Sequence, residues 1–299
     1  LQNKDKFRAF LTENGFNVPW AFGFSSETDA WSSRDEFSYP LIVKPTDSAG
    51  SKGVTRVDSE SDLKPALEYA FEHSIKGNII IEEFIEKRGC SSDTDSFSYN
   101  GELKMVTFSA QRFDENAINP YTPAAYSWPA TFTKEECDYL TLEIQRLLTL
   151  LKMNTSIYNI ETRIGTNGKP YIMEVSPRGG GNRLAEVVRY ATGVDMITAC
   201  TRAAVGDSIE DIQQKPYDGH WAEIVLHADE CGVFDKLEIA DSLPVEIIEK
   251  DIWVKPGDMV EGFEGANNAI GMLILKFKTS EDLEEALATQ NSWLKVIVK

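Results

Sequence analysis

Length, composition and charge restrict the class of protein. The chain has 299 residues, with 30 Lys or Arg against 48 Asp or Glu, and its formal net charge is −18. Nucleic acids and anionic membrane surfaces are bound through clustered basic residues, so this balance argues against both as partners. The length exceeds the ~100–150 residues of a typical single domain and predicts two or three lobes.

Cysteine use and hydropathy indicate a soluble protein of the cytoplasm. The four cysteines lie far apart and form neither a CxxC metal pattern nor a disulfide framework, which fits a reducing compartment. No apolar run approaches the ~18–20 residues of a membrane span. The first residues, LQNKDKFRAF, lack the apolar core of a signal peptide.

The first half of the chain is predicted to alternate strands and helices. NKDKFRAFLTENG indicates an opening helix between an Asn3 cap and a Gly15 stop. A hairpin is predicted at 95–109, where Asn100-Gly101 marks the turn. Apolar runs further predict strands at 39–45, 54–57 and 78–85, and a helix at 59–74.

The second half continues the alternation. Residues 122–132, TPAAYSWPATF, are predicted to form a loop. A helix then begins at Thr133 and carries an apolar stripe from Leu140 to Leu151. Further strands are predicted at 156–164, 170–176, 221–228 and 293–298, and further helices at about 183–192, 195–205 and 280–289. The pattern as a whole predicts an α+β chain with mixed sheets.

Residues 156–176, SIYNIETRIGTNGKPYIMEVS, predict a β-hairpin. Asn167-Gly168 is the pair that a two-residue type I′ turn prefers. Such a turn pairs Thr166 with Lys169 and thereby sets the register of both strands.

That register places Glu161 directly opposite Glu174. Opposed residues have Cβ atoms only ~4.5–5.5 Å apart, where two like charges are destabilising unless a positive group lies between them. Ser176 shares the face of Glu174, and Arg163 shares the face of Glu161. Carboxylate ligands suit Mg²⁺, which completes its coordination with water and nucleotide phosphates. The alternative is a solvated polar face in which Arg163 neutralises both acids.

A second cluster of interest is basic. Lys44 ends an apolar strand, and Lys52 lies in the following small-residue loop DSAGSKG. Such a loop lets backbone N–H groups approach phosphate oxygens, and a lysine adds a point charge. The chain contains neither a P-loop nor a GxGxxG fingerprint.

Four segments in order carry a family resemblance: NK before the opening helix, YPLIVKP with its loop, IIIEEFI, and IETRI followed by YIMEVSPR. On these, the chain resembles the ATP-grasp carboxylate–amine ligases, among them the carbamoyl-phosphate-synthase large chain and L-amino acid ligases. The resemblance runs nearly end to end and implies two sheet lobes, mixed or antiparallel, that enclose ATP, plus a small C-terminal α+β lobe. The implied parts are a leading helix at 1–18, a small lobe with the phosphate loop at 19–88, a large lobe with the metal site at 89–206 and a C-terminal lobe at 207–299.

The resemblance also implies site residues. Lys4 and Lys44 would contact the ATP phosphates, and Lys52 would lie on a mobile loop, Gly50–Gly53, that covers them. The adenine would meet the Glu83 carbonyl, the Ile85 amide and the Glu82 side chain. The implied metal ligands, for Mg²⁺ or alternatively Mn²⁺, are Glu161, Glu174 and Ser176. The implied catalytic residues are Arg178, Lys44 and Lys52, and the implied substrate contacts are Arg163, Gly179, Gly180 and Arg183.

The chain departs from the family pattern at three positions. Ser176 replaces the usual Asn, so a second ion would be held more weakly or through water. The ribose-binding acid is out of register, which leaves Asp93 or Asp95 as substitutes. Arg163 stands where an apolar residue often packs under adenine. Family members also carry a Rossmann-like domain before the opening helix, which is expected to be absent here because of truncation or to lie on another chain.

The implied reaction is ATP-dependent activation of a small carboxylic acid as an acyl phosphate, which an amine converts to an amide, with release of ADP and phosphate. A homodimer is an open possibility. Three alternatives remain: phosphorylation of bicarbonate as in carbamoyl-phosphate synthase or biotin carboxylase, a non-catalytic nucleotide-binding module, and a subunit whose acidic surface binds a protein partner.

Overall fold

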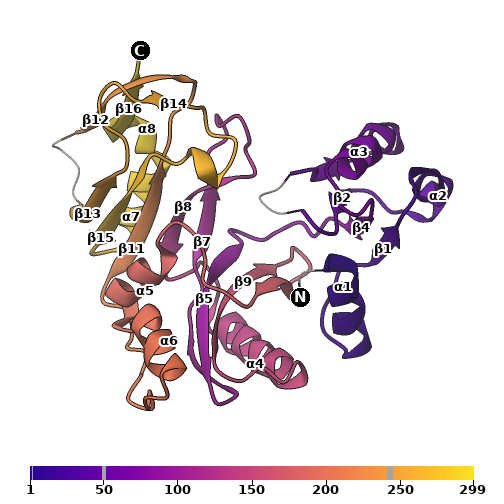
Figure 1. The fold of residues 1–299 in the computed structure, drawn as a ribbon, viewed down its shortest axis with the longest axis horizontal. Coiled ribbons are helices and arrows are strands. Elements are labelled where there is room, and N and C mark those ends of the chain that lie inside the picture. Colours follow the sequence, from indigo (N-terminus) through magenta and orange to yellow (C-terminus); the bar gives the residue numbers. More distant parts are fainter. Residues whose placement is uncertain (2, 49–51, 241–244) are drawn as a thin grey trace. The chain divides into compact units, whose positions relative to one another are not determined.

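The computed structural model describes residues 1, 3–48, 52–240 and 245–299, and these divide into two compact units (Figure 1). The first unit contains Leu1–Gly89 and Thr162–Ser176. The second unit contains Cys90–Glu161 and Pro177–Lys299. The boundary at 161–162 falls inside strand β9 (Ser156–Ile164), so this strand begins in the second unit and ends in the first.

An antiparallel sheet of order β1-β4-β2-β3 organises the first unit. Its buried face carries the apolar residues of the strands, which pack against α3 around Leu63 and Leu67. The elements of this unit are α1 (Lys4–Glu13), β1 (Ala21–Phe24), α2 (Glu27–Ser32), η1 (Arg34–Glu36), β2 (Leu41–Pro45), β3 (Thr55–Val57), α3 (Glu60–Glu72), β4 (Ile79–Glu83), the end of β9, and β10 (Pro170–Ser176).

The predicted opening helix is confirmed as α1. The Asn3 side chain accepts a hydrogen bond from the Lys6 N–H at 3.1 Å and so satisfies one free donor of the first turn. The chain leaves the helix through Gly15, whose φ of +71° lies in the left-handed region that glycine adopts without strain. Phe7, Arg8 and Leu11 are buried, so this helix directs a charged side chain into the unit.

Two further sheets lie wholly in the second unit, one of order β13-β15-β11-β8-β7 and one of order β14-β12-β16, while β9, β5 and β6 are neighbours in a third. The strands are β5 (Ser92–Tyr99), β6 (Glu102–Val106), β7 (Ala110–Phe113), β8 (Pro123–Trp128), β11 (His220–Leu226), β12 (Gly232–Ile239), β13 (Glu246–Ile252), β14 (Met259–Val260), β15 (Gly271–Phe277) and β16 (Leu294–Val298). The helices are α4 (Lys134–Leu150), α5 (Leu184–Thr192), α6 (Met196–Ala204), η2 (Ala266–Asn268), α7 (Ser280–Ala288) and α8 (Gln290–Trp293).

Most elements predicted for this unit are confirmed, but the loop predicted at 122–132 is wrong. Residues Pro123–Trp128 form β8, which pairs with β7 on one side and β11 on the other. Pro123 stands at the first position of the strand and Pro129 just after its end, where neither removes a central ladder hydrogen bond. The prolines therefore mark the ends of a buried strand.

The two Asn-Gly pairs form different turns. Asn100 and Gly101 both have positive φ, at 52° and 83°, and join paired residues Tyr99 and Glu102, as a two-residue type I′ turn requires. This prediction is confirmed.

The type I′ turn predicted at Asn167-Gly168 is wrong. Asn167 is not among the residues with positive φ, and Gly168 alone is left-handed, at 74°. The Gly168 N–H donates to the Gly165 carbonyl at 2.9 Å, and the Gly165 N–H donates to the Lys169 carbonyl at 2.9 Å. The Thr166 N–H, which the predicted pairing would direct to Lys169, donates instead to the Glu86 carbonyl at 2.8 Å.

These bonds describe a three-residue loop with Gly168 as the left-handed residue. The Asn167 side chain accepts a hydrogen bond from the Lys169 N–H at 3.0 Å, so the asparagine stabilises this loop through its side chain. The opposition of Glu161 and Glu174 was derived from a two-residue loop and therefore loses that support. Their joint use as metal ligands stays a proposal.

Candidate functional site

A buried triad of one acid and two bases occupies the first unit. The Arg8 Nε atom donates to Glu82 Oε1 at 2.7 Å, and Lys44 forms an ion pair with the other oxygen of the same carboxylate. The Glu82 side chain is 1% exposed. Position 82 follows a continuous apolar run of β4, which carries the carboxylate into the interior where only paired charges are stable.

The triad shifts the pKa of Glu82 and of Lys44. Burial alone would raise the pKa of Glu82, but the Lys44 ammonium and the Arg8 guanidinium outweigh burial and hold the pKa at about 2. Burial lowers the pKa of Lys44, and the attraction of the Glu82 carboxylate offsets this lowering only in part. In the structure, Glu82 thus serves as the counter-ion of Arg8 and Lys44. Its predicted contact with adenine stays a proposal.

Lys4 and Glu174 lie together in the same unit although 170 residues separate them. The Lys4 Nζ atom lies 3.6 Å from Glu174 Oε2 and 3.4 Å from the Ser48 carbonyl oxygen. The Glu174 side chain is 47% exposed, so its oxygens remain open to a ligand. Arg8 also donates to the carbonyl of Met173 at 2.8 Å, which connects the triad to the residue before Glu174.

The predicted adenine segment adopts an ordered path. The Glu83 N–H donates to the Trp20 carbonyl at 2.9 Å, and Ile85 is buried. Arg163 donates to the Ile85 carbonyl at 3.1 Å, so this arginine fixes the segment after β4. In the phosphate loop, the Lys52 carbonyl accepts a hydrogen bond from the Ser48 hydroxyl at 2.9 Å. The predicted covering loop, Gly50–Gly53, falls partly outside the described residues.

Three predicted residues of the second unit, Arg178, Gly179 and Gly180, lie near a buried aspartate. The Gly180 N–H donates to Asp95 Oδ1 at 2.7 Å, and Asn159 Nδ2 donates to the same oxygen at 3.3 Å. Burial raises the pKa of Asp95 to about 6, although the Gly180 and Asn159 bonds and the nearby Arg178 lower it. Arg178 itself is exposed and donates to the Gly179 carbonyl at 2.7 Å.

Glycine is needed at 180 because the backbone lies directly against other groups. A Cβ atom at this position would lie 2.5 Å from Leu184 Cδ1 and 3.0 Å from Asp95 Oδ1. Any other residue would therefore push aside the end of the Leu184 side chain and crowd the Asp95 carboxylate. The close packing of this turn therefore determines the position of the carboxylate.

Arg183 has acidic partners in its own unit. It pairs with Glu186, with Glu249 at 2.6 Å and with Asp251 at 3.1 Å. Its backbone is left-handed, with φ at 61°, at the position just before α5. Three carboxylates thus surround one guanidinium, and the predicted contact of Arg183 with substrate stays a proposal.

The sequence reasoning missed two charged residues that the structure brings into these clusters, Arg8 and Glu223. Arg8 is a lone base on the buried face of an amphipathic helix. Glu223 of β11 is a lone acid in the segment HWAEIVLHA, residues 220–228, where every residue from Trp221 to Ala228 is buried. A charge inside an apolar run was therefore the available signal in both cases.

The structure brings Lys4, Lys44, Glu82 and Glu174 together in the first unit and Arg178, Gly179 and Gly180 together around Asp95 in the second. Glu161 belongs to the second unit and Ser176 to the first. Asp93, the other predicted substitute for the ribose-binding acid, receives a hydrogen bond at its carbonyl from the Ser109 hydroxyl at 3.0 Å.

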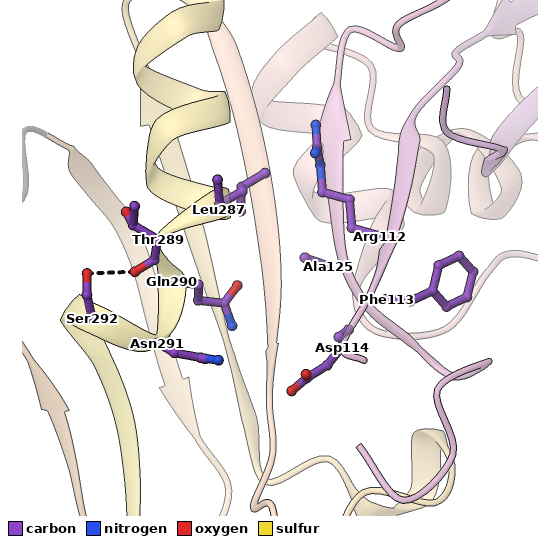
Figure 2. A pocket seen from close by; sticks show the side chains of 11 residues that line it. Arg112, Phe113, Asp114, Ala125, Leu287, Thr289, Gln290, Asn291 and Ser292 are labelled. Atoms are coloured by element: carbon purple, nitrogen blue, oxygen red, sulfur yellow. Dashed lines mark hydrogen bonds between the residues drawn. The ribbon is translucent and has the colours of Figure 1, made fainter. Parts of the chain in front are cut away.

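A cavity of about 330 Å³ lies elsewhere in the second unit. Figure 2 shows Arg112 and Asp114 on one side of it and Gln290 and Asn291 on the other. Asp114 also forms, with His227 and Asp229, the one group of three possible metal ligands that converges among the described residues. None of the predicted site residues lines this cavity.

Antiparallel sheets flanked by helices, with a cationic cluster beside a half-exposed carboxylate, define an α+β protein with a candidate anion- or metal-binding site. A family model described as an ATP-grasp domain matches residues 37–186, half of the chain. The chain belongs to the ATP-grasp family. The resemblance inferred from the four segments is confirmed, as is the α+β class of the fold.

Among curated proteins, the carbamoyl phosphate synthase large chain, C-terminal section, of Aquifex aeolicus is 22% identical over 73% of this chain and 39% of its own length. The carbamoyl phosphate synthase large chain of Corynebacterium glutamicum is 25% identical over 73% of this chain and 20% of its own length. The chain therefore spans about two fifths or less of these relatives.

Among solved structures, an L-amino acid ligase from Bacillus licheniformis aligns with a TM-score of 0.81 at 21% identity, covering 100% of this chain and 72% of that one. Phosphoribosylglycinamide synthetase from Anaerococcus prevotii aligns with a TM-score of 0.73 at 18% identity, covering 99% and 74%. These likenesses show the fold. Among the described residues, no helix has the length and apolar character that crossing a membrane requires.

Proposed function

We propose that the chain is an ADP-forming carbon–nitrogen ligase that activates a small carboxylic acid with ATP and joins it to an amine. The observation that carries the proposal is the approach of the Lys4 ammonium to the half-exposed Glu174 carboxylate, with Lys44 and Arg8 in the same unit. Cations beside an accessible carboxylate suit phosphate and Mg²⁺ at one place. Membership of the ATP-grasp family supports the same reaction class.

The atoms of the proposed reaction balance in two steps. A carboxylate oxygen of the acid attacks the γ-phosphorus of ATP, the bond to ADP breaks, and an acyl phosphate forms. The amine nitrogen then attacks the acyl carbon, the bond to phosphate breaks, and the nitrogen releases its proton. Lys4, Lys52 and Arg178 would offset the negative charge of the phosphates, and Lys44 would act from its buried position at the end of β2.

The donor set of the chain fits a hard divalent ion. Glu174 offers accessible oxygens, and Glu161 and Ser176 are the further proposed ligands, for Mg²⁺ or alternatively Mn²⁺. When bound, such an ion neutralises phosphate charge. One solved neighbour, the biotin carboxylase domain of a Hydrogenobacter thermophilus 2-oxoglutarate carboxylase, is described as a complex with MgADP and bicarbonate, and aligns with a TM-score of 0.77 at 16% identity.

The cellular compartment of the enzyme is also part of the proposal. All four cysteines are free, which supports a reducing compartment such as the cytoplasm. The remaining proposals are the domain boundaries at 18, 88 and 206, the substrate contacts of Arg163, Gly179, Gly180 and Arg183, and the adenine contacts of Glu82, Glu83 and Ile85. The homodimer also stays a proposal, which light scattering of the purified chain would test.

Glu174→Gln tests the proposal, because an amide keeps the size of the side chain and removes the charge that attracts a cation. We expect loss of ADP release and of Mg²⁺-dependent ATP binding, with an unchanged thermal melting curve. ADP and phosphate would be measured over a panel of amino acids and small carboxylates, with Glu68→Gln on exposed α3 surface as the matched control. Full activity of Glu174→Gln would refute the assignment.

Bicarbonate is the second candidate substrate, favoured by the carbamoyl phosphate synthase relatives. The same assay separates the two candidates. ADP release that depends on bicarbonate without an organic acid would support bicarbonate phosphorylation. ATP binding without ADP release over the whole panel would support a non-catalytic module.

A further inference from the structure

Three side chains that can bind a metal converge where two strands of the second unit end. Asp114 directly follows β7, His227 directly follows β11, and Asp229 stands two residues further along. One ligand atom from each of the three lies within 4.8 Å of the others. Strand β8 separates β7 from β11 in the sheet, so the cluster joins two strands that do not pair with each other.

A buried hydrogen bond of His227 fixes which of its ring nitrogens carries the hydrogen. The Nδ1 atom lies 2.8 Å from the Val225 carbonyl oxygen, which can only accept, so Nδ1 is the donor. In the neutral ring the lone pair is then on Nε2. Histidines that bind metals have this arrangement, because their second nitrogen commonly donates to a backbone carbonyl. The Phe263 ring, stacked on the imidazole at 4.1 Å, holds the plane of the ring.

The Nε2 atom of His227 faces a second acceptor. It lies 3.1 Å from Asp114 Oδ2, and the His227 side chain is 5% exposed. A lone pair and a carboxylate oxygen repel each other at this distance unless a proton or a metal ion lies between them. Two ligands of one Zn²⁺ ion, each about 2.0–2.2 Å from the ion, are themselves roughly 3.0–3.5 Å apart. The distance therefore suits a metal ion as well as a shared proton.

Asp229 favours the metal ion over the shared proton. Its carboxylate forms no ion pair or side-chain hydrogen bond among the described residues. A shared proton joins two acceptors and leaves two carboxylates facing a single imidazolium charge. A divalent ion binds all three ligand atoms, and its two charges match the two carboxylates.

The backbone around the cluster is fixed by the fold. The Asp114 Oδ1 atom accepts a hydrogen bond from the Asn116 N–H at 2.9 Å, which orients the carboxylate. The residue between the other two ligands, Ala228, accepts a hydrogen bond at its carbonyl from the Phe263 N–H at 3.1 Å. The ligands therefore need little ordering when an ion binds.

An ion can reach the cluster from solvent. Asp229 is exposed. Asp114 lines the cavity of about 330 Å³ between the end of β7 and the residues around α8, where Figure 2 shows it across from Asn291. The cluster thus has a solvent-facing side and a cavity beside it, which leaves room for water to complete the coordination.

We propose that Asp114, His227 and Asp229 bind a divalent transition-metal ion, for which Zn²⁺ is the probe, and that this ion ties the ends of β7 and β11 together. One imidazole nitrogen and two carboxylates suit Zn²⁺ better than Mg²⁺, because Mg²⁺ prefers oxygen ligands alone. The ion is separate from the Mg²⁺ of the proposed reaction, and the inference goes beyond the ligase function.

Calorimetry with Zn²⁺ alone tests the proposal, on the metal-free full chain in excess Mg²⁺ and without ATP. We expect the Zn²⁺ affinity to fall roughly tenfold or more in Asp229→Ala and in His227→Gln, because each substitution removes a ligand. Asp207→Ala, at another exposed aspartate of the second unit, is the matched control and should bind like wild type. Zn²⁺ should also raise the melting temperature of wild type and of the control, but not that of Asp229→Ala.

Asp229→Ala changes an exposed side chain, so the test holds even if His227→Gln fails to fold. Equal Zn²⁺ affinity of wild type and Asp229→Ala, or no Zn²⁺ binding at all, would overturn the proposal and leave His227 and Asp114 as an ion pair without a metal. The ligase function is decided separately, because Mg²⁺-dependent ATP binding should be lost in Glu174→Gln and kept in Asp229→Ala. Failure of every acid to yield ADP would end the proposed function without changing the Zn²⁺ result.

Discussion

Each unit of the molecule buries one glutamate completely, and the two are treated in opposite ways. Glu82 of the first unit is held between Arg8 and Lys44, and its pKa falls to about 2. Glu223 of the second unit has no hydrogen-bond partner among the described residues, and its pKa lies well above the ordinary range. Burial is nearly equal, so the difference comes from the neighbouring bases.

The comparison separates a structural carboxylate from one available for function. A buried acid between two bases is compensated by them, so its removal destabilises the fold, whereas a buried acid without bases is uncompensated and is retained for another reason. The Glu82 cluster also holds α1 in place through Arg8, while Glu223 lies on a strand that apolar neighbours already hold. The same chemical group thus has two different energetic signs in one chain.

The largest expected effect is that of Glu82→Gln. Removing this charge leaves Arg8 and Lys44 buried beside each other without a counter-ion, which costs about 3–5 kcal/mol. Urea unfolding would measure the loss, and hydrogen exchange would locate it in the first unit. The matched control, Glu68→Gln on the exposed side of α3, should change the free energy of unfolding by less than about 0.5 kcal/mol. An equal effect of the two substitutions would mean that the buried Glu82 matters no more for stability than an exposed glutamate.

Glu223→Gln should have the opposite sign and a smaller size. The amide cannot ionise and breaks no hydrogen bond among the described residues, so we expect the free energy of unfolding to exceed that of wild type by about 1–3 kcal/mol at pH values where the wild-type carboxyl group is ionised. Thermal and urea unfolding of the purified variant would measure the gain. A destabilised Glu223→Gln protein would mean that the carboxylate has a structural partner after all.

The third expected effect is a difference in pH dependence, which vanishes at low pH. Asp95 has a folded pKa of about 6, above the ordinary 3.8, so its ionisation lowers stability progressively as pH rises from about 4 to about 6. Asp95→Asn does not titrate, and its stability relative to wild type should increase over that window by up to about 3 kcal/mol and then stay level.

Glu82 supplies the contrast for the pH experiment. Its pKa is depressed from 4.5 to about 2, so its contribution to stability is present above pH 4.5 and is lost as pH falls toward 2. Unfolding free energies of wild type and Asp95→Asn between pH 3 and 8 would show both slopes. Parallel curves for the two proteins above pH 4 would contradict the raised pKa of Asp95.

Local sequence patterns predicted most of the fold, because caps and periodicity act within a few residues. The capping box of Thr133 and Glu136 at α4 is an example, and so is the Asn100-Gly101 turn. The strand β8 escaped prediction because its pairing with β7 and β11 overrides the local signal of its prolines. The Asn167-Gly168 turn escaped because Thr166 bonds to Glu86, a contact distant in sequence.

The candidate site divides in the same way. Lys4, Lys44 and Glu174 were predicted from the recognisable segments in which they stand, and the structure places Lys4 beside Glu174 and pairs Lys44 with Glu82. The partner of Glu82 in α1 and the isolation of Glu223 in β11 depend on how distant segments pack, which no local spacing reports. The sequence alone therefore does not show which buried charges have a partner of opposite charge.

The Arg8, Glu82 and Lys44 triad also constrains how such a sequence can diverge. Replacing one of the three residues by an uncharged one leaves the other charges buried without a full set of partners. Sequences with only one of these positions changed should therefore be strongly disfavoured by selection. Descendants are expected to keep all three residues or to replace them together with apolar ones. The ion pair between Arg8 of this helix and Glu82, more than seventy positions away in β4, is thereby expected to persist among related sequences.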